Sequence, residues 1–322
     1  MYIDFYKFQD HPFQLTPDPR FFFGSSVHRR AEAHLLYGLS QGEGFIVVTG
    51  DVGAGKTTLV GHLLSTLDPK RYRAARIVST NLGADDMLRM VAGAFAVPHE
   101  GVSKAGLLER IEQALAASLK QGLRSVLLVD EAQNLSVQAL EELRMLSNFQ
   151  VGRQAPLQSF LLAQPQFRRT LAGRDLDQLR QRVIASYHLG PLDREETAAY
   201  VRHRLGRVGW TDDPRIDDEA LAAVFRHTGG MPRRINTLCS RVLLYGALEE
   251  LRRIGPEIID QVADDLEREF ETVLDRSPGP EATDGLSGRV EILAKRIESA
   301  ELRLRRHDRA LRMAGRTVVP GE

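Results

Sequence analysis

An eight-residue motif constrains this chain more than any other feature of its sequence. Residues 50–57 match the pattern G-x-x-x-x-G-K-[ST], and they lie between an apolar run at 45–49 and an amphipathic helical pattern at 56–67. Glycines at these positions allow backbone N–H groups to turn inward around phosphate oxygens, and the positive end of the following helix adds to the attraction. A purely structural glycine turn would not need a lysine and a threonine at the last two positions. The candidate nucleotide-binding residues are therefore Gly50, Asp51, Val52, Gly53, Ala54, Gly55, Lys56, Thr57 and Thr58.

Two acidic residues about seventy positions further on complete this chemistry. Lys56 is expected to reach the β- and γ-phosphate oxygens of ATP, and the hydroxyl of Thr57 is expected to bind Mg²⁺. The apolar run 126–129 ends in Asp130 and Glu131, and the carboxyl end of a strand is where an open α/β sheet builds its ligand crevice. Asp130 would hold Mg²⁺ through water and Glu131 would act as general base on the attacking water. An acidic helix-capping turn is the alternative, and it explains less well why both acids follow a buried strand.

The order of apolar patterns predicts an α/β fold. Short continuous apolar runs alternate with helical patterns between residues 45 and 189, which is typical of a parallel sheet covered on both faces. The five predicted strands are 45–49, 74–79, 125–129, 158–162 and 183–188. The predicted covering helices are 56–67, 84–95, 104–120 and 137–149. Strand signals then stop, and a small helical domain is predicted from helices at 194–208, 217–227, 233–251 and 256–270.

The expected organisation has five parts. An N-terminal segment, 1–40, is expected to pack on the core, 41–190, which is followed by a helical lid, 191–275. A linker rich in Pro, Gly and Ser occupies 276–288, and a short amphipathic helix is expected over 289–313. Apolar residues in that tail alternate at steps of four and three, as in a coiled coil, but Ala300 and His307 are poor seam residues. A solvated amphipathic helix, or an arginine-rich contact with acidic groups or lipid, remains an alternative.

Composition limits the location and the partners of the protein. The 322 residues contain 43 basic and 43 acidic residues, so no overall field draws the chain to nucleic acid or to an anionic membrane. Cys239 is the single cysteine, which excludes an internal disulfide and is expected to serve helix packing. The N-terminus has no signal-peptide pattern, and no apolar run approaches the roughly 18 residues of a spanning helix. A cytoplasmic protein without an integral membrane segment is expected, although it could dock on membrane proteins.

Four further polar residues are candidates for contacts with bound nucleotide. Gln164 follows the fourth predicted strand and is expected to sense the γ-phosphate or orient water, unless it only starts a loop. Arg180 and Arg182 precede the fifth strand, where one of them would reach the ATP of a neighbouring subunit or both would form ordinary salt bridges. Arg233 opens a helix of the second domain and is expected to touch the phosphates from above.

Six sequence segments carry a resemblance to a known family. They read HPFQLTPDP at 11–19, YGL at 37–39, GEGF at 42–45, DEAQNL at 130–135, QP at 164–165 and GMPRRIN at 230–236. In these segments the chain resembles the AAA+ ATPases similar to general secretion pathway protein A. Within them it resembles the secretion ATPases associated with exosortase/PEP-CTERM and exopolysaccharide loci. The resemblance runs from about residue 3 to residue 270.

The resemblance implies an AAA+ core of five strands with a helical lid, a ring-like or dimeric assembly, and service to an envelope export machine. It assigns Gln164 to the sensor-1 position, Arg182 or Arg180 to the arginine finger, and Arg233 to sensor 2. Asn81 is similar to the polar residue that restrains the catalytic glutamate, with a turn cap as the alternative. The sequence departs from the family at 163–166, where Ala-Gln-Pro-Gln replaces Gly-Gln-Pro-Glu. The transmembrane helix and peptidoglycan-binding region of longer relatives are not matched, so direct wall contact is not expected.

Three functions follow from these observations. The first is an ATP-driven motor or switch that forms a homo-oligomer and acts on protein components of an export machine at the inner membrane. The second is a DNA-associated ATPase like the transposition regulators, which share a similar P-loop and Asp-Glu-Ala-Gln box. The neutral charge balance and the lack of a helix-turn-helix or long basic arm disfavour nucleic acid as a partner. The third is a nucleotide-dependent adaptor, which would have no use for the base Glu131.

Overall fold

The computed structural model describes residues 1–16, 18–78 and 83–275. Residues 1–265 form one compact unit and residues 266–322 a second. Three of the sequence-based expectations lie outside the described residues: the role of Asn81, the linker 276–288 and the tail helix 289–313.

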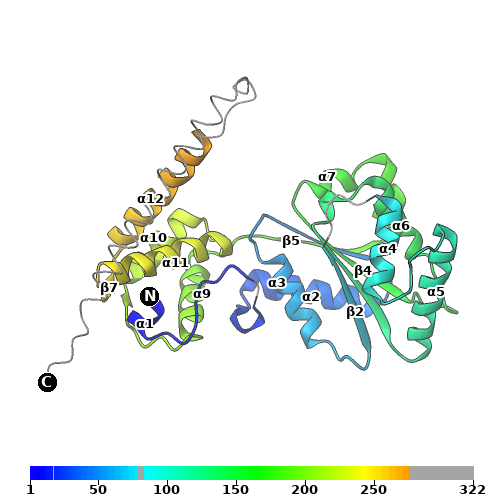
Figure 1. The fold of residues 1–322 in the computed structure, drawn as a ribbon, viewed down its shortest axis with the longest axis horizontal. Coiled ribbons are helices and arrows are strands. Elements are labelled where there is room, and N and C mark those ends of the chain that lie inside the picture. The colour runs from blue at the N-terminus through cyan, green and yellow to red at the C-terminus, as the bar shows by residue number, and fades with distance from the viewer. Residues whose placement is uncertain (17, 79–82, 276–322) are drawn as a thin grey trace. The chain divides into compact units, whose positions relative to one another are not determined.

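A five-stranded parallel sheet forms the centre of the first unit (Figure 1). Its strands are β1 (Phe45–Gly50), β2 (Tyr72–Val78), β3 (Arg124–Asp130), β4 (Leu157–Ala163) and β5 (Val183–Leu189). They are arranged in the order β2-β3-β4-β1-β5, which confirms the predicted fold class. Both β1 and β3 pair with β4, so the segments that follow these three strands leave the same edge of the sheet side by side.

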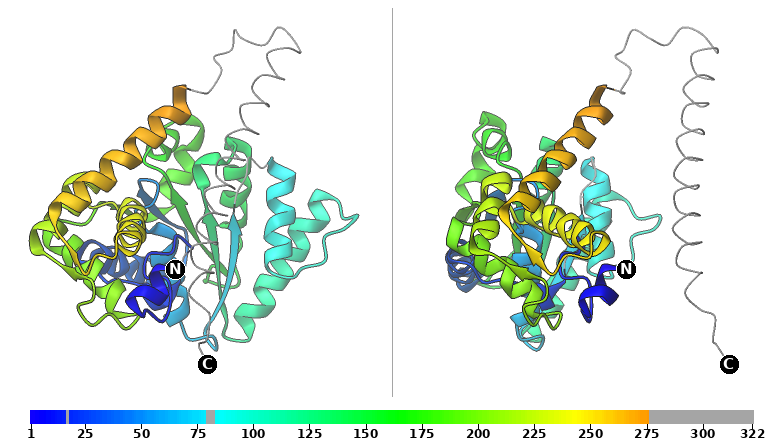
Figure 2. Two further views of the ribbon diagram at one scale, coloured as in Figure 1. Left: turned by 60° about the vertical axis from the view of Figure 1, so that its left-hand side comes forward. Right: turned by 90° about the vertical axis from the view of Figure 1, so that its left-hand side faces the viewer.

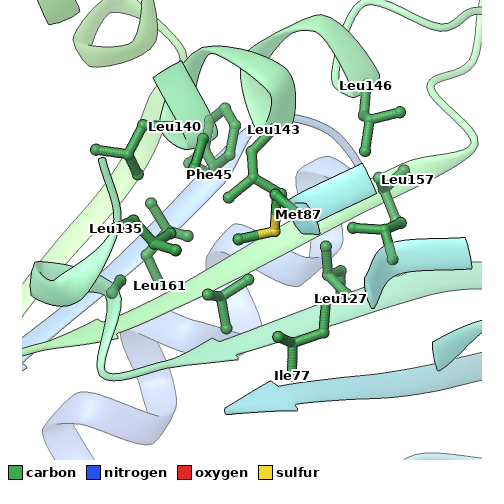
Figure 3. Packing of buried hydrophobic residues seen from close by; sticks show 14 of the residues in the cluster. Phe45, Ile77, Met87, Leu127, Leu135, Leu140, Leu143, Leu146, Leu157 and Leu161 are labelled. Atoms are coloured by element: carbon green, nitrogen blue, oxygen red, sulfur yellow. The ribbon is translucent and has the colours of Figure 1, made fainter. Parts of the chain in front are cut away.

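Helices cover both faces of the sheet. On one face lie α4 (Ala84–Ala94), α5 (Lys104–Lys120) and α6 (Val137–Leu146), and on the other lie α2 (Ser26–Gln41) and α3 (Lys56–Thr66). Along β1, Phe45 and Val47 face the first set of helices, whereas Ile46 and Val48 face the second. Figure 3 shows the first of these layers, in which Met87 of α4 lies among leucines from the strands and from α6. Burying one Leu, Ile, Met or Phe side chain in these layers contributes about 1.5–3 kcal/mol to the stability of the fold. The two layers together therefore fix the strands of the sheet in place.

A helical lid follows β5. It contains α9 (Arg194–Gly206), α10 (Asp218–Thr228), α11 (Pro232–Leu248) and α12 (Pro256–Asp275), close to the predicted ranges. The lid also holds one short parallel pair, β6 (Arg215–Ile216) and β7 (Arg253–Ile254), which the sequence analysis did not predict. Two residues per strand are too few to give a detectable period. Cys239 is buried in α11, and burial raises the pKa of its thiol to about 12, in keeping with the packing role expected for it.

The N-terminal segment divides between the lid and the sheet. Its helix α1 (Tyr2–Tyr6) packs on α11, and the hydroxyl of Tyr6 donates to the carbonyl of Leu251 at 3.0 Å. Figure 2 shows this part of the chain, in dark blue, beside the lid helices. The second half of the segment forms α2, which lies against β5. The sequence analysis expected the whole segment to pack on the core.

Short helices complete the described unit. They are η1 (Pro19–Phe21), η2 (Ala132–Asn134), α7 (Phe167–Leu171), η3 (Arg174–Leu176) and α8 (Asp177–Gln181). None of the described helices combines the length and the apolar character needed to cross a bilayer.

Candidate functional site

The glycine-rich loop 50–57 has the backbone conformation that its sequence predicts. Gly53 and Gly55 have φ angles of 85° and 92°, a region that favours glycine, and Gly55 is the N-cap of α3. The lid contacts this loop directly, because the N–H of Arg233 donates to the carbonyl of Gly53 at 3.2 Å. A Cβ on Gly53 would lie only 2.3 Å from the Cβ of Arg233. Glycine is therefore needed here for two reasons, the backbone angle and the close approach of the lid.

Lys56 lies buried inside the loop, with 7% of its surface exposed. Its ammonium group donates to the carbonyls of Gly50 at 2.7 Å and Asp51 at 3.0 Å. Burial lowers the pKa of Lys56, while the nearby carboxylates of Glu131 and Asp130 act in the opposite direction. The loop thus holds a partly desolvated positive charge at the point where phosphates are expected.

Thr57 and Asp130 are brought together although they are 73 residues apart in the sequence. The hydroxyl of Thr57 donates to Oδ2 of Asp130 at 2.9 Å, and the N–H of Glu131 donates to Oδ1 at 3.0 Å. Arg76, on the edge strand β2, also donates to Oδ2 of Asp130 at 2.9 Å. Asp130 is only 4% exposed, whereas the guanidinium of Arg76 beside it is half-exposed. The carboxylate of Asp130 is therefore buried next to the start of α3. The sequence analysis did not identify Arg76.

The donor set at this point fits Mg²⁺ in the presence of a nucleotide. A hydroxyl oxygen and a carboxylate oxygen lie together, and Mg²⁺ in such sites takes one or two protein oxygens and completes its shell with phosphates and waters. Among the described residues there is no group of three or more His, Cys, Asp or Glu side chains that could hold a metal by itself. The site therefore suits a metal that arrives with its phosphate ligands.

Glu131 lies next to two glutamines. Its φ angle of 53° places a non-glycine residue in the left-handed region, which occurs often at functional sites. Gln133 donates from Nε2 to Oε2 of Glu131 at 2.5 Å, and Gln164 donates to the same oxygen at 3.5 Å. The backbone N–H of Gln164 donates to Oε1 of Gln133 at 3.0 Å. The structure thus brings together the predicted base and the predicted sensor, with Gln133, to which the sequence analysis gave no role, between them.

A cavity of about 320 Å³ opens over the glycine-rich loop. Four parts of the chain line it: the loop with the start of α3, the N-terminal segment, the lid, and Glu131 after β3. The N-terminal segment contributes Phe21, Phe23 and His28, and the lid contributes Tyr200 and Arg204. Aromatic surface on one side and phosphate-binding groups on the other fit a nucleotide, and the volume lies in the range of small-molecule sites.

His28 is an uncharged member of this cavity. It is 6% exposed, and its Nδ1 lies 2.7 Å from the hydroxyl of Ser25. Burial lowers its pKa to about 4, so the ring is neutral at neutral pH. Its Nε2 lies on the side of Gly55, 3.1 Å from where a Cβ on that glycine would stand. The sequence analysis missed His28, and the serine three residues earlier, a helix N-cap, is the signal that could have identified it.

Arg204 is a buried cation with neutral partners. It is 6% exposed and donates to the carbonyls of Pro12 at 2.5 Å and Gln14 at 3.3 Å, and to the hydroxyl of Tyr200 at 2.8 Å. The bonds to Pro12 and Gln14 tie the N-terminal segment to the lid. Lys56, Arg204 and Arg233 also line the cavity, and these three cations outnumber its two acids, Asp18 and Glu131, which favours an anionic ligand.

The two finger candidates occupy different environments. Arg182 donates from Nη1 to the carbonyl and hydroxyl of Ser147, at 2.9 and 3.3 Å, at the end of α6. Arg180 is half-exposed and makes a 2.9 Å ion pair with Asp177 of its own short helix. Neither lines the cavity of its own chain. Arg182 is engaged inside the subunit, whereas Arg180 is available on the surface.

Comparison with known proteins identifies the class. Residues 39–171 match the family described as AAA domain. Solved structures with a similar fold include CDC6P from Pyrobaculum aerophilum, with a TM-score of 0.63 and 16% identity, covering 77% of this chain and 71% of that one. The Aeropyrum pernix ORC2 protein gives a TM-score of 0.61 at 14% identity, covering 80% of this chain and 72% of that one. At such identities the likeness concerns the fold alone. The fold, the glycine-rich loop and the AAA domain match together show that this chain contains an AAA-type P-loop core.

A curated relative is more similar in sequence. General secretion pathway protein A of Aeromonas hydrophila is 40% identical over 245 residues, which cover 76% of this chain and 44% of that protein. The chain therefore spans less than half the length of this relative.

Proposed function

We propose that this protein binds Mg-ATP in the cavity over the glycine-rich loop and uses its hydrolysis as a motor or switch. The observation that carries the proposal is the convergence of three groups at one edge of the sheet. They are the buried ammonium of Lys56, the Thr57–Asp130 pair, and the carboxylate of Glu131. Together they are the parts that phosphoryl transfer requires, namely positioning, charge neutralisation and a base for water.

In the proposed reaction each residue has one role. Lys56 exchanges its two carbonyl partners for β- and γ-phosphate oxygens. Thr57 and, through water, Asp130 would hold Mg²⁺, which would supply positive charge to the phosphates. Glu131 accepts a proton from a water whose oxygen bonds to the γ-phosphorus, while the bond from that phosphorus to the β–γ bridging oxygen breaks and ADP leaves with the electron pair. Gln164 reports the presence of the γ-phosphate through its contact with Glu131.

The lid and a second subunit complete the proposed site. The contact between the backbone N–H of Arg233 and Gly53 supports the assignment of Arg233 as the sensor-2 residue, which would bind a phosphate. Arg180 is the better candidate for an arginine finger that acts on the ATP of a neighbour, because its ion pair with Asp177 is half-exposed, whereas the bonds of Arg182 to Ser147 are partly buried. A homo-oligomer follows from this assignment.

The proposed cellular role is service to an envelope export system. The 40% identity to General secretion pathway protein A supports a role in secretion. The six sequence segments that resemble exosortase- and exopolysaccharide-associated ATPases support the finer assignment to such a locus. We place the protein at the cytoplasmic face of the inner membrane, held there by protein components of the export machine.

Complementation in cells tests this role. The gene is deleted, and export of polysaccharide and of secreted proteins is measured after supply of the wild-type chain or of Glu131→Gln at equal protein levels. The proposal predicts loss of one export class on deletion, rescue by the wild type and no rescue by the variant. Normal export without the gene, or full rescue by the variant, would contradict it.

A further inference from the structure

The side-chain amide of Gln133 connects two parts of the site. Its Nε2 donates to the carboxylate of Glu131 at 2.5 Å, and its Oε1 accepts the backbone N–H of Gln164 at 3.0 Å. Glu131 is the first residue after β3, and Gln164 is the first residue after β4. One planar amide therefore spans the gap between the base and the sensor loop.

The chemistry of this position requires a group that both donates and accepts. A carboxylate accepts but does not donate, so a donor must face Glu131, and a backbone N–H needs an acceptor. Gln166 sets the orientation of the side-chain amide of Gln164, because the Nε2 of Gln166 donates to Oε1 of Gln164 at 2.9 Å. With its oxygen engaged in this way, Gln164 points its Nε2 at the carboxylate of Glu131. The donors on this side of the site thus point at the carboxylate in a consistent direction.

We propose that Gln133 is a positioning residue for ATP hydrolysis. It holds the Glu131 carboxylate in place and links it to the backbone of the sensor loop, so that movement of that loop on binding the γ-phosphate moves the base. The inference rests on the proposed function, in which Glu131 is the base and Gln164 the sensor. The left-handed backbone at Glu131 adds to the need for such support, since a strained residue keeps its geometry only when its surroundings fix it.

Two substitutions separate the two hydrogen bonds of Gln133. Gln133→Met keeps the length of the side chain and removes both bonds. Gln133→Glu keeps an acceptor for the N–H of Gln164 but places a second negative charge against Glu131. Gln138→Met, at an exposed glutamine of α6, is the matched control. Steady-state ATPase rates and the affinity for a fluorescent ADP analogue are measured for each variant.

The inference predicts a change in kcat with KM unchanged. Losing a hydrogen bond to a charged group corresponds to a change in rate of about 10- to 100-fold, so Gln133→Met is expected to lower kcat by that factor. Its KM and its affinity for ADP are expected to stay within about twofold of the wild type. Gln133→Glu is expected to be slower still, because like charges push the base out of position. The control is expected to match the wild type. A kcat within about twofold of the wild type for either Gln133 variant would overturn the inference, and so would a loss confined to nucleotide affinity.

A double-variant comparison distinguishes this inference from the function on which it depends. If Gln133 acts through Glu131, adding Gln133→Met to Glu131→Gln lowers the single-turnover rate no further. A further drop of tenfold or more would show an independent effect and overturn the inference, with Glu131 still the base. Near wild-type turnover by Glu131→Gln alone would instead remove the proposed base and, with it, the role of Gln133.

Discussion

Substituting Arg180 and Arg182 one at a time separates an internal structural contact from a catalytic contact between subunits. Arg182 donates two hydrogen bonds to Ser147 at the end of α6, and this partly buried contact is worth about 1–2 kcal/mol after allowance for its solvent access. For a unit of this size that corresponds to a fall in Tm of about 2–8 °C in Arg182→Ala. Arg180 makes an exposed pair with Asp177, worth less than about 0.5 kcal/mol, so Arg180→Ala is expected to melt within about 2 °C of the wild type.

Activity is expected to show the opposite order. An arginine finger contributes about 10³–10⁵ in rate, so Arg180→Ala should lose at least about 10³ in ATPase activity while it keeps its affinity for nucleotide. Mixing Arg180→Ala with Glu131→Gln should restore part of the activity, because some interfaces then combine an intact base with an intact finger. Activity per chain of the wild type should also rise with protein concentration.

Thermal unfolding and ATPase assays on the same preparations check both expectations, with Arg153→Ala, at an exposed turn before β4, as the control. Wild-type activity in Arg180→Ala together with an inactive, thermally unchanged Arg182→Ala would refute the reasoning and make Arg182 the finger. Mixtures that stay as inactive as their components would remove the finger altogether.

Three further outcomes are expected from the same structure. Lys56→Ala should weaken ATP binding by at least about 100-fold in calorimetric titration, because the β- and γ-phosphates lose a charged donor. Unchanged affinity would contradict the assignment of the loop 50–57 as the phosphate-binding loop. Arg76→Ala should lower the Mg²⁺ concentration needed for ADP binding by about two- to fivefold, because the guanidinium competes for Asp130, the carboxylate that would hold the metal through water. An unchanged or higher Mg²⁺ requirement would contradict that competition. Duplex DNA is expected neither to bind at physiological salt nor to raise ATPase activity, because the acidic and basic residues of the chain balance. Salt-dependent DNA binding together with stimulated turnover would favour the DNA-associated alternative.

The fold was predictable from the sequence because its three central strands, β1, β3 and β4, are buried on both faces. Such strands appear as short continuous apolar runs, and the run predicted at 125–129 differs from β3 (Arg124–Asp130) by one residue at each end. The helix α2 was predictable in principle but was not identified. Its buried residues recur at steps of three and four, Ser25 caps its start, and Gly42, with a φ angle of 74°, ends it.

Contacts between distant segments were not predictable from local patterns. Arg204 bonds to the carbonyl of Pro12, 192 residues away, and neither periodicity nor composition encodes such a pair. Arg76 has the exposure of an ordinary edge-strand residue, and its contact with Asp130 depends on the register that places Val78 opposite that acid. The same is true of Gln133, whose role depends on where the loop after β4 lies. Motif spacing predicted which residue types form the site, whereas strand order determines which of them touch.

The central claim is that Glu131 is the base of an ATP-hydrolysing site. Single-turnover hydrolysis of Mg-ATP by Glu131→Gln, measured beside its ATP affinity, tests this claim most directly. The account predicts that ATP affinity stays within a fewfold of the wild type while the rate of turnover falls at least about 100-fold, because the amide cannot take the proton from water. Hydrolysis at a near wild-type rate with ATP fully bound would contradict it.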